Sequence, residues 1–408
     1  MSTRKEKIPT VRFRAFSEPW FQNQLSEVAE FSKGRGYSKK DIQPQGTPII
    51  LYGRLYTKYE SVISNIDTYA NMEKNSVISE GGEVIIPASG ESAAEISRAS
   101  CVTDGGVILG GDINIVKPHE SLDSSFIAIT LSNGSQQREL SKRAQGKSVV
   151  HLHNSDLKAV KLFYPSYEEQ FAIGSLFRNI DDLLASYKDN LANYQSLKAT
   201  MLTKMFPKAG QTVPEIRLDG FEGDWEKIDL NNSTSRVKSY SLSRDVESNQ
   251  DTGLKYIHYG DIHLGKVSRI DDGKLIPYIK PNTTLNEFLQ KGDLIFADAS
   301  EDYKGIAEVA VLACDIPETI VAGLHTIAVR PKSSFDSIFL FYMFKTQTFR
   351  RYGYKVGTGM KVFGISPSNL MKYEFYYPDK KEQSAIGSYF SNLDNLINSH
   401  QEKISQLE

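Results

Sequence analysis

The chain has 408 residues, of which 40% are hydrophobic and 24% are charged, and its formal net charge is −2. It is long enough for two or more globular domains, and its near-neutral charge excludes a global positive field, so any nucleic-acid surface must come from segregated Lys and Arg. No apolar run reaches the roughly 18 to 20 residues of a membrane span, there is no signal-peptide core, and Cys101 and Cys314 are isolated, so we expect a cytoplasmic protein without disulfides or a CxxC metal site.

Residues 1–164 mix short β-branched or aromatic runs with turn residues, which is typical of an α+β unit dominated by strands. A single helix is expected over about 124–143, with Ser or Asp as its N-cap. Strands are expected at 48–52, 83–88, 107–109 and 113–116.

Residues 165–207 predict one long spacer helix. Pro165 followed by Glu168 and Glu169 suits the positive end of a helix dipole, and the helix should run to about Met205, before Pro207. About 38 residues at 1.5 Å each would make a rod of roughly 55 to 60 Å. Its apolar residues alternate at spacings of four and three: Ile173, Phe177, Ile180, Leu184, Tyr187, Leu191 and Tyr194.

The second half of the chain repeats the first. Residues 165–184 and 378–397 are identical at about half of their positions, and further matches pair Arg12 with Arg217 and Trp20 with Trp225. Residues 208–377 therefore predict a second α+β unit, with a helix over 336–351 and partner strands at 254–259, 293–297, 307–312 and 325–329.

Residues 378–408 predict a second spacer helix, which has no counterparts of 196–206. Its matching stripe is Ile386, Phe390, Leu393, Ile397, His400, Ile404 and Leu407. One such stripe alone fits the core face of a single helix as well as a coiled coil. Two matched stripes favour packing against each other, and a pseudo-twofold relation between the halves would make the pair antiparallel.

Two basic stretches recur in both halves and predict DNA contacts. The first follows the helix of each unit and combines glycine, which lets the backbone approach a phosphate, with basic side chains and Gln or Thr. The second is basic and aromatic, and the alternative for both is a solvated surface. The expected DNA contacts are Lys33, Arg35, Tyr37, Arg54, Lys142, Arg143, Gln145, Lys147, Lys238, Tyr240, Lys304, Arg350, Arg351, Lys355, Thr358 and Lys361.

Catalytic motifs are missing from the sequence. Residues 146–148 resemble the end of a P-loop, but Ser141 stands where its first glycine belongs, and His151 and His153 have no nearby ligand cluster. The acidic residues Asp298, Glu301 and Asp302 fit a nuclease metal site, acceptors for cytosine amino groups, or a solvated loop.

The duplicated pattern P-x-x-x-E-Q-x-x-I, followed each time by a heptad helix, resembles the specificity subunit of a type I restriction-modification system. The resemblance covers nearly the whole chain. It rests on Pro165, Glu169, Gln170, Ala172 and Ile173, on Pro378, Glu382, Gln383, Ala385 and Ile386, and on the segments 82–86 and 292–296.

The resemblance implies a subunit without catalysis of its own, in which two target recognition domains, held apart by two antiparallel helices, each read one half of a split DNA site. Two methylation subunits would dock on the helices and restriction subunits would join them, bringing S-adenosylmethionine, ATP and magnesium. No NPPY or DPPY methyltransferase motif occurs in the chain. The alternatives are a methyltransferase or nuclease with its own recognition domains, and a coiled-coil scaffold for proteins alone.

Overall fold

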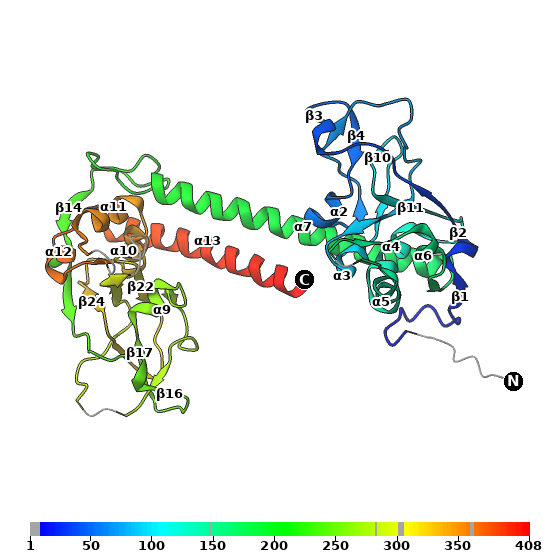
Figure 1. Cartoon of the computed structure of the whole chain (residues 1–408). Coiled ribbons are helices and arrows are strands. Elements are labelled where there is room, and N and C mark those ends of the chain that lie inside the picture. The colour runs from blue at the N-terminus through cyan, green and yellow to red at the C-terminus, as the bar shows by residue number, and fades with distance from the viewer. Residues whose placement is uncertain (1–8, 147, 282–283, 301–305, 360–362) are drawn as a thin grey trace. The chain divides into compact units, whose positions relative to one another are not determined.

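The computed structural model describes residues 9–146, 148–281, 284–300, 306–359 and 363–408. It divides into two compact units, Met1–Ser186 and Tyr187–Glu408 (Figure 1). No helix in the described part of the chain is long and apolar enough to cross a lipid bilayer.

The first unit is built around a five-stranded sheet in the order β2-β11-β7-β9-β5, in which only the β5–β9 pair is parallel. Its central strand, β7 (Glu83–Pro87), is buried at every position. Side chains alternate between the two faces of a strand, so Val84 and Ile86 pack with Phe126 of helix α4, whereas Ile85 packs with Ile113 and other residues in a second core on the opposite face. The central strand thus supports two cores.

The other strands of the five-stranded sheet are β2 (Ala29–Lys33), β5 (Val62–Ile63), β9 (Ser100–Val102) and β11 (Ile113–Pro118). A smaller sheet, β10-β4-β6-β3, consists of β3 (Ile42–Gln43), β4 (Thr47–Ile50), β6 (Tyr69–Ala70) and β10 (Ile108–Leu109). Two antiparallel two-stranded sheets, each formed by strands that are distant in the sequence, complete the unit: β1 (Phe21–Gln24) with β13 (Lys161–Tyr164), and β8 (Ser89–Gly90) with β12 (Val150–His151). The helices are α1 (Leu25–Val28), α2 (Arg54–Thr57), α3 (Ala93–Ile96), α4 (Ser124–Ser132), α5 (Gly134–Arg143) and α6 (Asn154–Lys158), with a short 3-10 turn at Lys39–Asp41.

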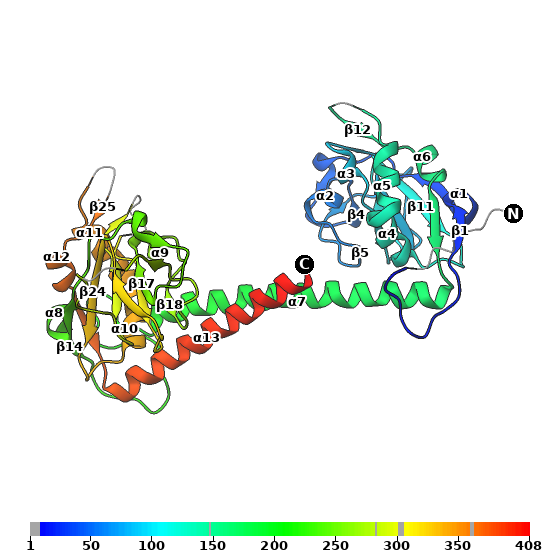
Figure 2. The same ribbon diagram turned by 90° about the horizontal axis from the view of Figure 1, so that it is seen from below.

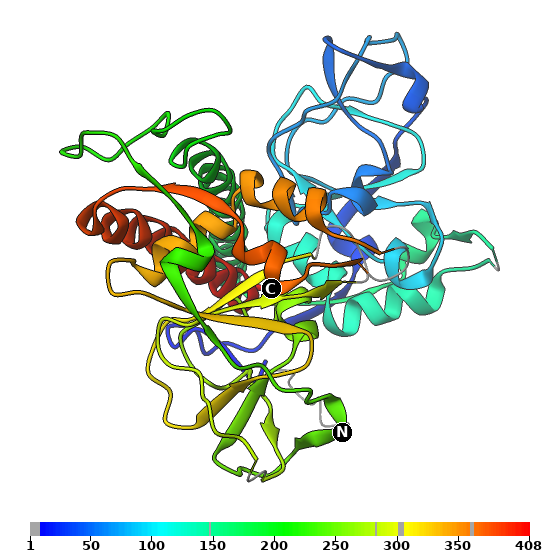
Figure 3. The same cartoon turned by 90° about the vertical axis from the view of Figure 1, so that its left-hand side faces the viewer.

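The second unit repeats this topology strand for strand. Its five-stranded sheet runs β15-β24-β20-β22-β18, and its smaller sheet runs β16-β19-β17-β23. The orange helices α10 and α11 lie on one side of the yellow strands (Figure 3). The strands are β14 (Glu226–Asp229), β15 (Thr234–Val237), β16 (Glu247–Ser248), β17 (Leu254–Ile257), β18 (Arg269–Ile270), β19 (Tyr278–Ile279), β20 (Leu294–Ala297), β21 (Ala299–Ser300), β22 (Val309–Leu312), β23 (Thr319–Ala322), β24 (Thr326–Pro331), β25 (Phe363–Gly364) and β26 (Glu374–Tyr377). The helices are α8 (Leu230–Ser233), α9 (Tyr259–His263), α10 (Ser337–Phe344), α11 (Gln347–Val356) and α12 (Pro367–Met371), with a 3-10 turn at Arg244–Val246.

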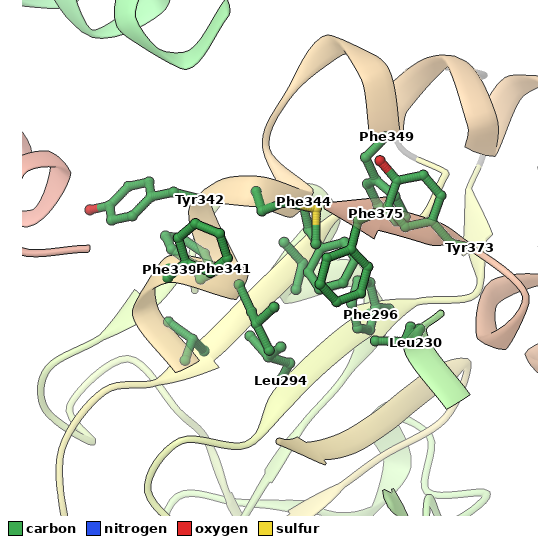
Figure 4. Close-up of a cluster of buried hydrophobic side chains, with 14 of the residues drawn as sticks. Leu230, Leu294, Phe296, Phe339, Phe341, Tyr342, Phe344, Phe349, Tyr373 and Phe375 are labelled. Carbon is green, nitrogen blue, oxygen red and sulfur yellow. The ribbon is translucent and has the colours of Figure 1, made fainter. Parts of the chain in front are cut away.

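The largest core of the second unit is rich in aromatic side chains. Leu294 and Phe296 of β20 face Phe339 and Phe344 of α10, and the rings of Phe296 and Phe344 meet edge to face at 4.9 Å (Figure 4). Ring pairs in this geometry contribute roughly 0.5–1.5 kcal/mol beyond the area that they bury. The core therefore fixes α10 firmly on the sheet.

Two sequence predictions about these elements were wrong. The helix expected over 124–143 is broken at Asn133, because Gly134 adopts φ +65° and starts a new helix, and the second copy is broken after Phe344. The strand at 107–109 is not the counterpart of that at 307–312. β10 pairs in parallel with β4 in the small sheet, as β23 does with β17, and the true counterpart of β22 is β9. Short apolar runs do not reveal which sheet they join.

The two long helices are α7 (Tyr167–Lys204, 38 residues) and α13 (Lys380–Leu407, 28 residues). Within the second unit the last turns of α7 lie beside α13 (Figure 2). Lys198 forms an ion pair with Asp394, the Tyr194 ring lies 5.2 Å from that of His400, and Lys188 Nζ lies 2.7 Å from Glu408 Oε1. Residue numbers fall along one helix as they rise along the other, so this pair is antiparallel, as the sequence predicted.

The apolar stripe of α13 forms part of the core of its unit. Phe390 is fully buried and stacks on Phe206, which follows the end of α7, at 5.9 Å. Ile386, Leu393 and Ile397 are buried as well, whereas Ile404 is half-buried. The stripe on α7 is more exposed: Ile173, Ile180, Leu184 and Leu191 are half-buried and Phe177 is 42% exposed.

Candidate nucleic-acid interface

The repeated E-Q motif joins each long helix to its globular part. The Arg12 guanidinium donates to both carboxylate oxygens of Glu169 at 2.7 and 2.6 Å, and Arg217 donates to both oxygens of Glu382 at 2.7 Å. The two glutamates are 1% and 0% exposed. Planar two-point pairs of this kind fix orientation as well as distance. The segment before the first strand is thereby held against the first turn of the helix.

The neighbouring glutamine completes the joint. Gln170 Oε1 accepts from the backbone N–H of Asp123 at 3.0 Å, and its Nε2 donates to the carbonyl oxygens of Ser121 and Pro165. Gln383 makes the matching bonds to Asp336, Ser334 and Pro378. Both glutamines are essentially fully buried, so these bonds are shielded from water.

At each joint a glycine lets the long helix come close to the start of a shorter helix, α4 in the first unit and α10 in the second. A Cβ on Gly174 would lie 2.7 Å from Asp123 Oδ1, and one on Gly387 would lie 3.2 Å from Asp336 Oδ1. Asp123 and Asp336 are the N-caps of α4 and α10; of the two residue types that the sequence offered, Ser and Asp, the structure uses Asp. The Pro-x-x-x-Glu-Gln-x-Ala-Ile-Gly segment is therefore a positioning device that fixes each long helix on its own unit.

The basic segment in each unit consists of the last turns of α5 or α11 and the residues that follow, and it carries exposed polar side chains. Lys142, Gln145, Arg351, Lys355 and Thr358 are all exposed. The segment pairs with a neighbouring strand in each unit: Gln145 exchanges backbone hydrogen bonds with His151, and Thr358 with Gly364. Backbone pairing with exposed side chains suits phosphate contact. Lys147, Lys304 and Lys361 lie outside the described residues.

Three of the arginines expected to contact DNA are instead held by the fold. Arg350 is 9% exposed, and its guanidinium bonds Glu308 at 2.7 Å and the carbonyl of Ile306 at 2.8 Å. Arg54, whose side chain is 8% exposed, bonds Glu60 and Asp67. Arg143 is one-third exposed and bonds Glu139 and the carbonyl of Ala159. We therefore place these three outside the proposed DNA contacts.

The repeated tyrosines of the second basic patch close a loop in each unit. The Tyr37 hydroxyl donates to the carbonyl of Asn71 and accepts from the N–H of Glu73, and Tyr240 accepts from the N–H groups of Asn286 and Glu287. Around them, Lys33, Arg35 and Lys238 are exposed, and Lys238 Nζ lies 4.9 Å from the centre of the Tyr240 ring. The lysines and Arg35 keep their place among the proposed contacts, whereas the two tyrosines hold the loop.

One feature of both units was missed by sequence reasoning. Asp112 and His325 are non-glycine residues in the left-handed region, with φ +56° and +54°. They occupy matching corners, between β10 and β11 in one unit and between β23 and β24 in the other. A match of the halves at a shift of 213 residues pairs these positions, but one is Asp and the other is His, so identity could not reveal them.

A comparison with known families identifies the chain. The family model described as "Type I restriction modification DNA specificity domain" matches residues 17–193 and 257–408. The chain belongs to this family. The match falls on both halves of the repeat, so each unit carries a DNA specificity domain, and the chain is a specificity subunit of the type I restriction-modification kind.

Two related proteins match most of the chain. The type I restriction enzyme MjaVIII specificity subunit of Methanocaldococcus jannaschii is 21% identical over 404 residues, which cover 96% of this chain and 90% of that protein. The putative type I restriction enzyme MjaX specificity subunit of the same organism is 20% identical over 309 residues, covering 73% and 68%. Both relatives are named as specificity subunits, in keeping with a recognition role.

Solved structures share the fold. The crystal structure of a type I restriction-modification S subunit from M. genitalium superposes with a TM-score of 0.58 at 16% identity, covering 95% of this chain and 92% of that one. The HsdS subunit from Thermoanaerobacter tengcongensis gives 0.50 at 15% identity, with 95% and 93% covered. The predicted fold class, two tandem strand-rich α+β domains with long helices, is confirmed.

Proposed function

We propose that each unit reads one half of a split, asymmetric DNA sequence and that the long helices set the length of the unread spacer. The observation that carries this proposal is the duplication of one specificity unit together with its joint: the same Arg–Glu pair and the same glutamine bridges fix each unit to a long helix. A reader fixed to a helix cannot slide along it, so the helix length becomes part of the recognised pattern.

The exposed side chains on the last turns of α5 and α11 and on the residues that follow supply the contacts that hold DNA in register. Lys142, Arg351 and Lys355 would neutralise phosphates, while Gln145 and Thr358 address base edges in the major groove. Because the whole chain has a net charge of only −2, DNA affinity depends on these local cations, and it should fall steeply with added salt.

The helices would also bind the catalytic partners. In the first unit, α7 carries large apolar side chains that are 42–50% exposed: Tyr167, Phe171, Leu176, Phe177 and Leu183. Exposed apolar side chains gathered on one helix fit a protein interface. Two methylation subunits would dock here and on α13, and restriction subunits would join them. S-adenosylmethionine, ATP and magnesium would then be bound by the partners, in a cytoplasmic complex that acts on DNA.

The experiment that tests this function is to express the chain together with the methylation subunit of its own system and to map methylated adenines by single-molecule sequencing. A split motif with a fixed spacer, absent when this chain is omitted, is the expected result. Methylation of an uninterrupted motif, or of the same motif without this chain, would overturn the proposal. The rival function, a methyltransferase acting alone, requires the purified chain to methylate DNA by itself when S-adenosylmethionine is added.

A further inference from the structure

The two units build the same backbone corner next to their basic segments. In the second unit the N–H of Asp298 donates to the carbonyl of His325 at 3.0 Å. In the first unit the N–H of Ala88 donates to the carbonyl of Asp112 at 2.7 Å. In both, the hydrogen bond links the end of the central strand to a residue in the left-handed region.

A residue with a side chain in the left-handed region points to a role for that side chain. Glycine adopts this conformation without steric cost, whereas a side chain there is uncommon and costs up to a few kcal/mol. Each unit nevertheless has a polar side chain at this position, Asp112 or His325, and both are exposed. Glycine would fit these corners at lower steric cost, and the polar side chains found there instead point to a role outside the turn.

The residues at the two corners differ between the units, whereas the residues at the joints with the long helices are the same in both. Arg12, Glu169, Gln170 and Gly174 recur unchanged in the second copy, whereas Ala88 and Asp112 are replaced by Asp298 and His325. In a duplicated scaffold, shared positions serve the common fold, and divergent polar positions serve what differs between the copies. For two specificity domains, what differs is the base sequence that each reads.

The second corner presents a hydrogen-bonding pair to solvent. His325 Nδ1 lies 3.1 Å from Asp298 Oδ1, and since a carboxylate only accepts, Nδ1 is the donor. The His325 ring meets the ring of Tyr259 edge to face at 5.4 Å, which holds it in place. The side chains of Asp298 and His325 are 26% and 51% exposed, and Asp298 Oδ2 has no hydrogen-bond partner in the described part of the chain.

The pair adjoins the segment that we assign to DNA contact. The N–H of Ile365 donates to the carbonyl of Asp298 at 2.9 Å, and the preceding residue, Gly364, exchanges backbone bonds with Thr358. Burial raises the pKa of the Asp298 carboxyl, and His325 opposes that increase. A partly desolvated acceptor held by a neighbouring imidazole is well prepared to exchange water for a ligand donor.

We propose that Asp298, oriented by His325, is a base-reading residue of the second unit and accepts a hydrogen bond from the exocyclic amino group of a cytosine or an adenine in the major groove. This inference rests on the proposed function. Carboxylates are suited to this role because they accept but do not donate, so they reject the carbonyl oxygens of guanine and thymine at the same place. Asp112 occupies the equivalent corner of the first unit.

The test compares methylation motifs of variants expressed with the methylation subunit. Asp298→Asn keeps the size of the side chain and adds a donor, His325→Ala removes the orienting imidazole, and Asp315→Asn is the matched control, because Asp315 has an 87% exposed side chain in the same unit. We expect Asp298→Asn to relax or change one base of one half-site, with roughly 5- to 10-fold loss of discrimination there, and His325→Ala to relax the same base. In both variants the other half-site and the spacer should stay as in the wild type, and the Asp315→Asn control should methylate the wild-type motif.

Failure of this inference is distinguishable from failure of the proposed function. If the wild-type chain gives a split motif and Asp298→Asn leaves both half-sites unchanged, or if the two half-sites change together, Asp298 is not a base reader. If the wild-type chain itself gives no split motif, the proposed function fails. The thermal unfolding midpoint of each variant is measured alongside. Should Asp298→Asn be unfolded, His325→Ala decides, since loss of an exposed imidazole leaves the backbone hydrogen bond at this corner intact.

Discussion

Gln170 illustrates how one side chain joins a helix to a domain. Replacing it with Ala leaves the buried N–H of Asp123 and two carbonyl groups without partners, and we expect the free energy of unfolding of the first unit to fall by about 1–3 kcal/mol. Denaturant titration followed by circular dichroism measures this change. Gln195→Ala is the control, because Gln195 is exposed on the same helix. Equal midpoints for both variants would show that the joint is not stabilised by these bonds.

Lys355 tests the assignment of phosphate contacts. We expect Lys355→Ala to weaken DNA binding by a similar factor on all sequences and to reduce the slope of log affinity against log salt by about 0.9, because one fewer counterion is released. Fluorescence anisotropy at several salt concentrations measures the slope. Lys403→Ala, an exposed lysine on α13, serves as the control. A loss confined to one sequence would assign Lys355 to base reading instead.

At the residue scale the sequence revealed the residues that join each long helix to its unit, but it did not reveal that several arginines are paired within the fold. Identical residues at a constant shift mark packing that both units need, so Glu169, Gln170 and their copies stood out. Arg350 and Tyr240 also lie in matched basic stretches, but the partners that bind them, Glu308 and the backbone of 286–287, come from distant parts of the chain. Charge and aromaticity in a stretch of sequence do not tell a paired side chain from an exposed one.

Among the elements, the two long helices give a matched pair of apolar positions. Phe390 on α13 is fully buried, whereas Phe177, its counterpart on α7, is 42% exposed. We expect Phe390→Ala to lower the stability of the second unit by about 3–5 kcal/mol, since it removes contacts with Phe206 and Tyr342. Differential scanning calorimetry would record an earlier unfolding transition.

Phe177→Ala should behave differently. Surface substitutions usually change stability by about 0.5 kcal/mol or less, so the unfolding transition should stay near that of the wild type. The variant should instead bind methylation subunits more weakly, which sedimentation velocity of the mixed proteins measures. If the Phe177→Ala variant binds methylation subunits as well as the wild type does, Phe177 is not part of the proposed docking surface.

Elements could be predicted where periodicity or length is strong. The heptad stripes located both long helices, and α7 ends at Lys204, next to the predicted Met205. The break at Asn133 is marked in the sequence by the pair Asn133-Gly134, a turn signal that was overlooked because the residues on both sides are compatible with a continuous helix. Strands of two or three residues, such as β9 and β10, carry too little pattern to show which sheet they join.

For the whole molecule, the proposed function makes α7 a measure of DNA length. Inserting four residues after Leu184 adds about one helical turn, or roughly 6 Å, and we expect the preferred spacer to lengthen by on the order of two base pairs. Both half-sites should stay unchanged, because no residue of either globular part is altered. Methylation mapping of the insertion variant measures both properties. A changed half-site with an unchanged spacer would show that the length of α7 does not set the spacer.

The joint also bears on how the protein is made. In each unit the first strand pairs with the last, Phe21 with Tyr164 and Glu226 with Tyr377, and Arg12 meets Glu169 only after 157 residues of separation. Contacts between such distant residues form late and close large loops. During translation, neither unit can close before the start of its own long helix has left the ribosome. A chain released just before Glu169 would therefore keep the pairing of β1 with β13 but lose both the carboxylate that holds Arg12 and the glutamine that bridges to α4.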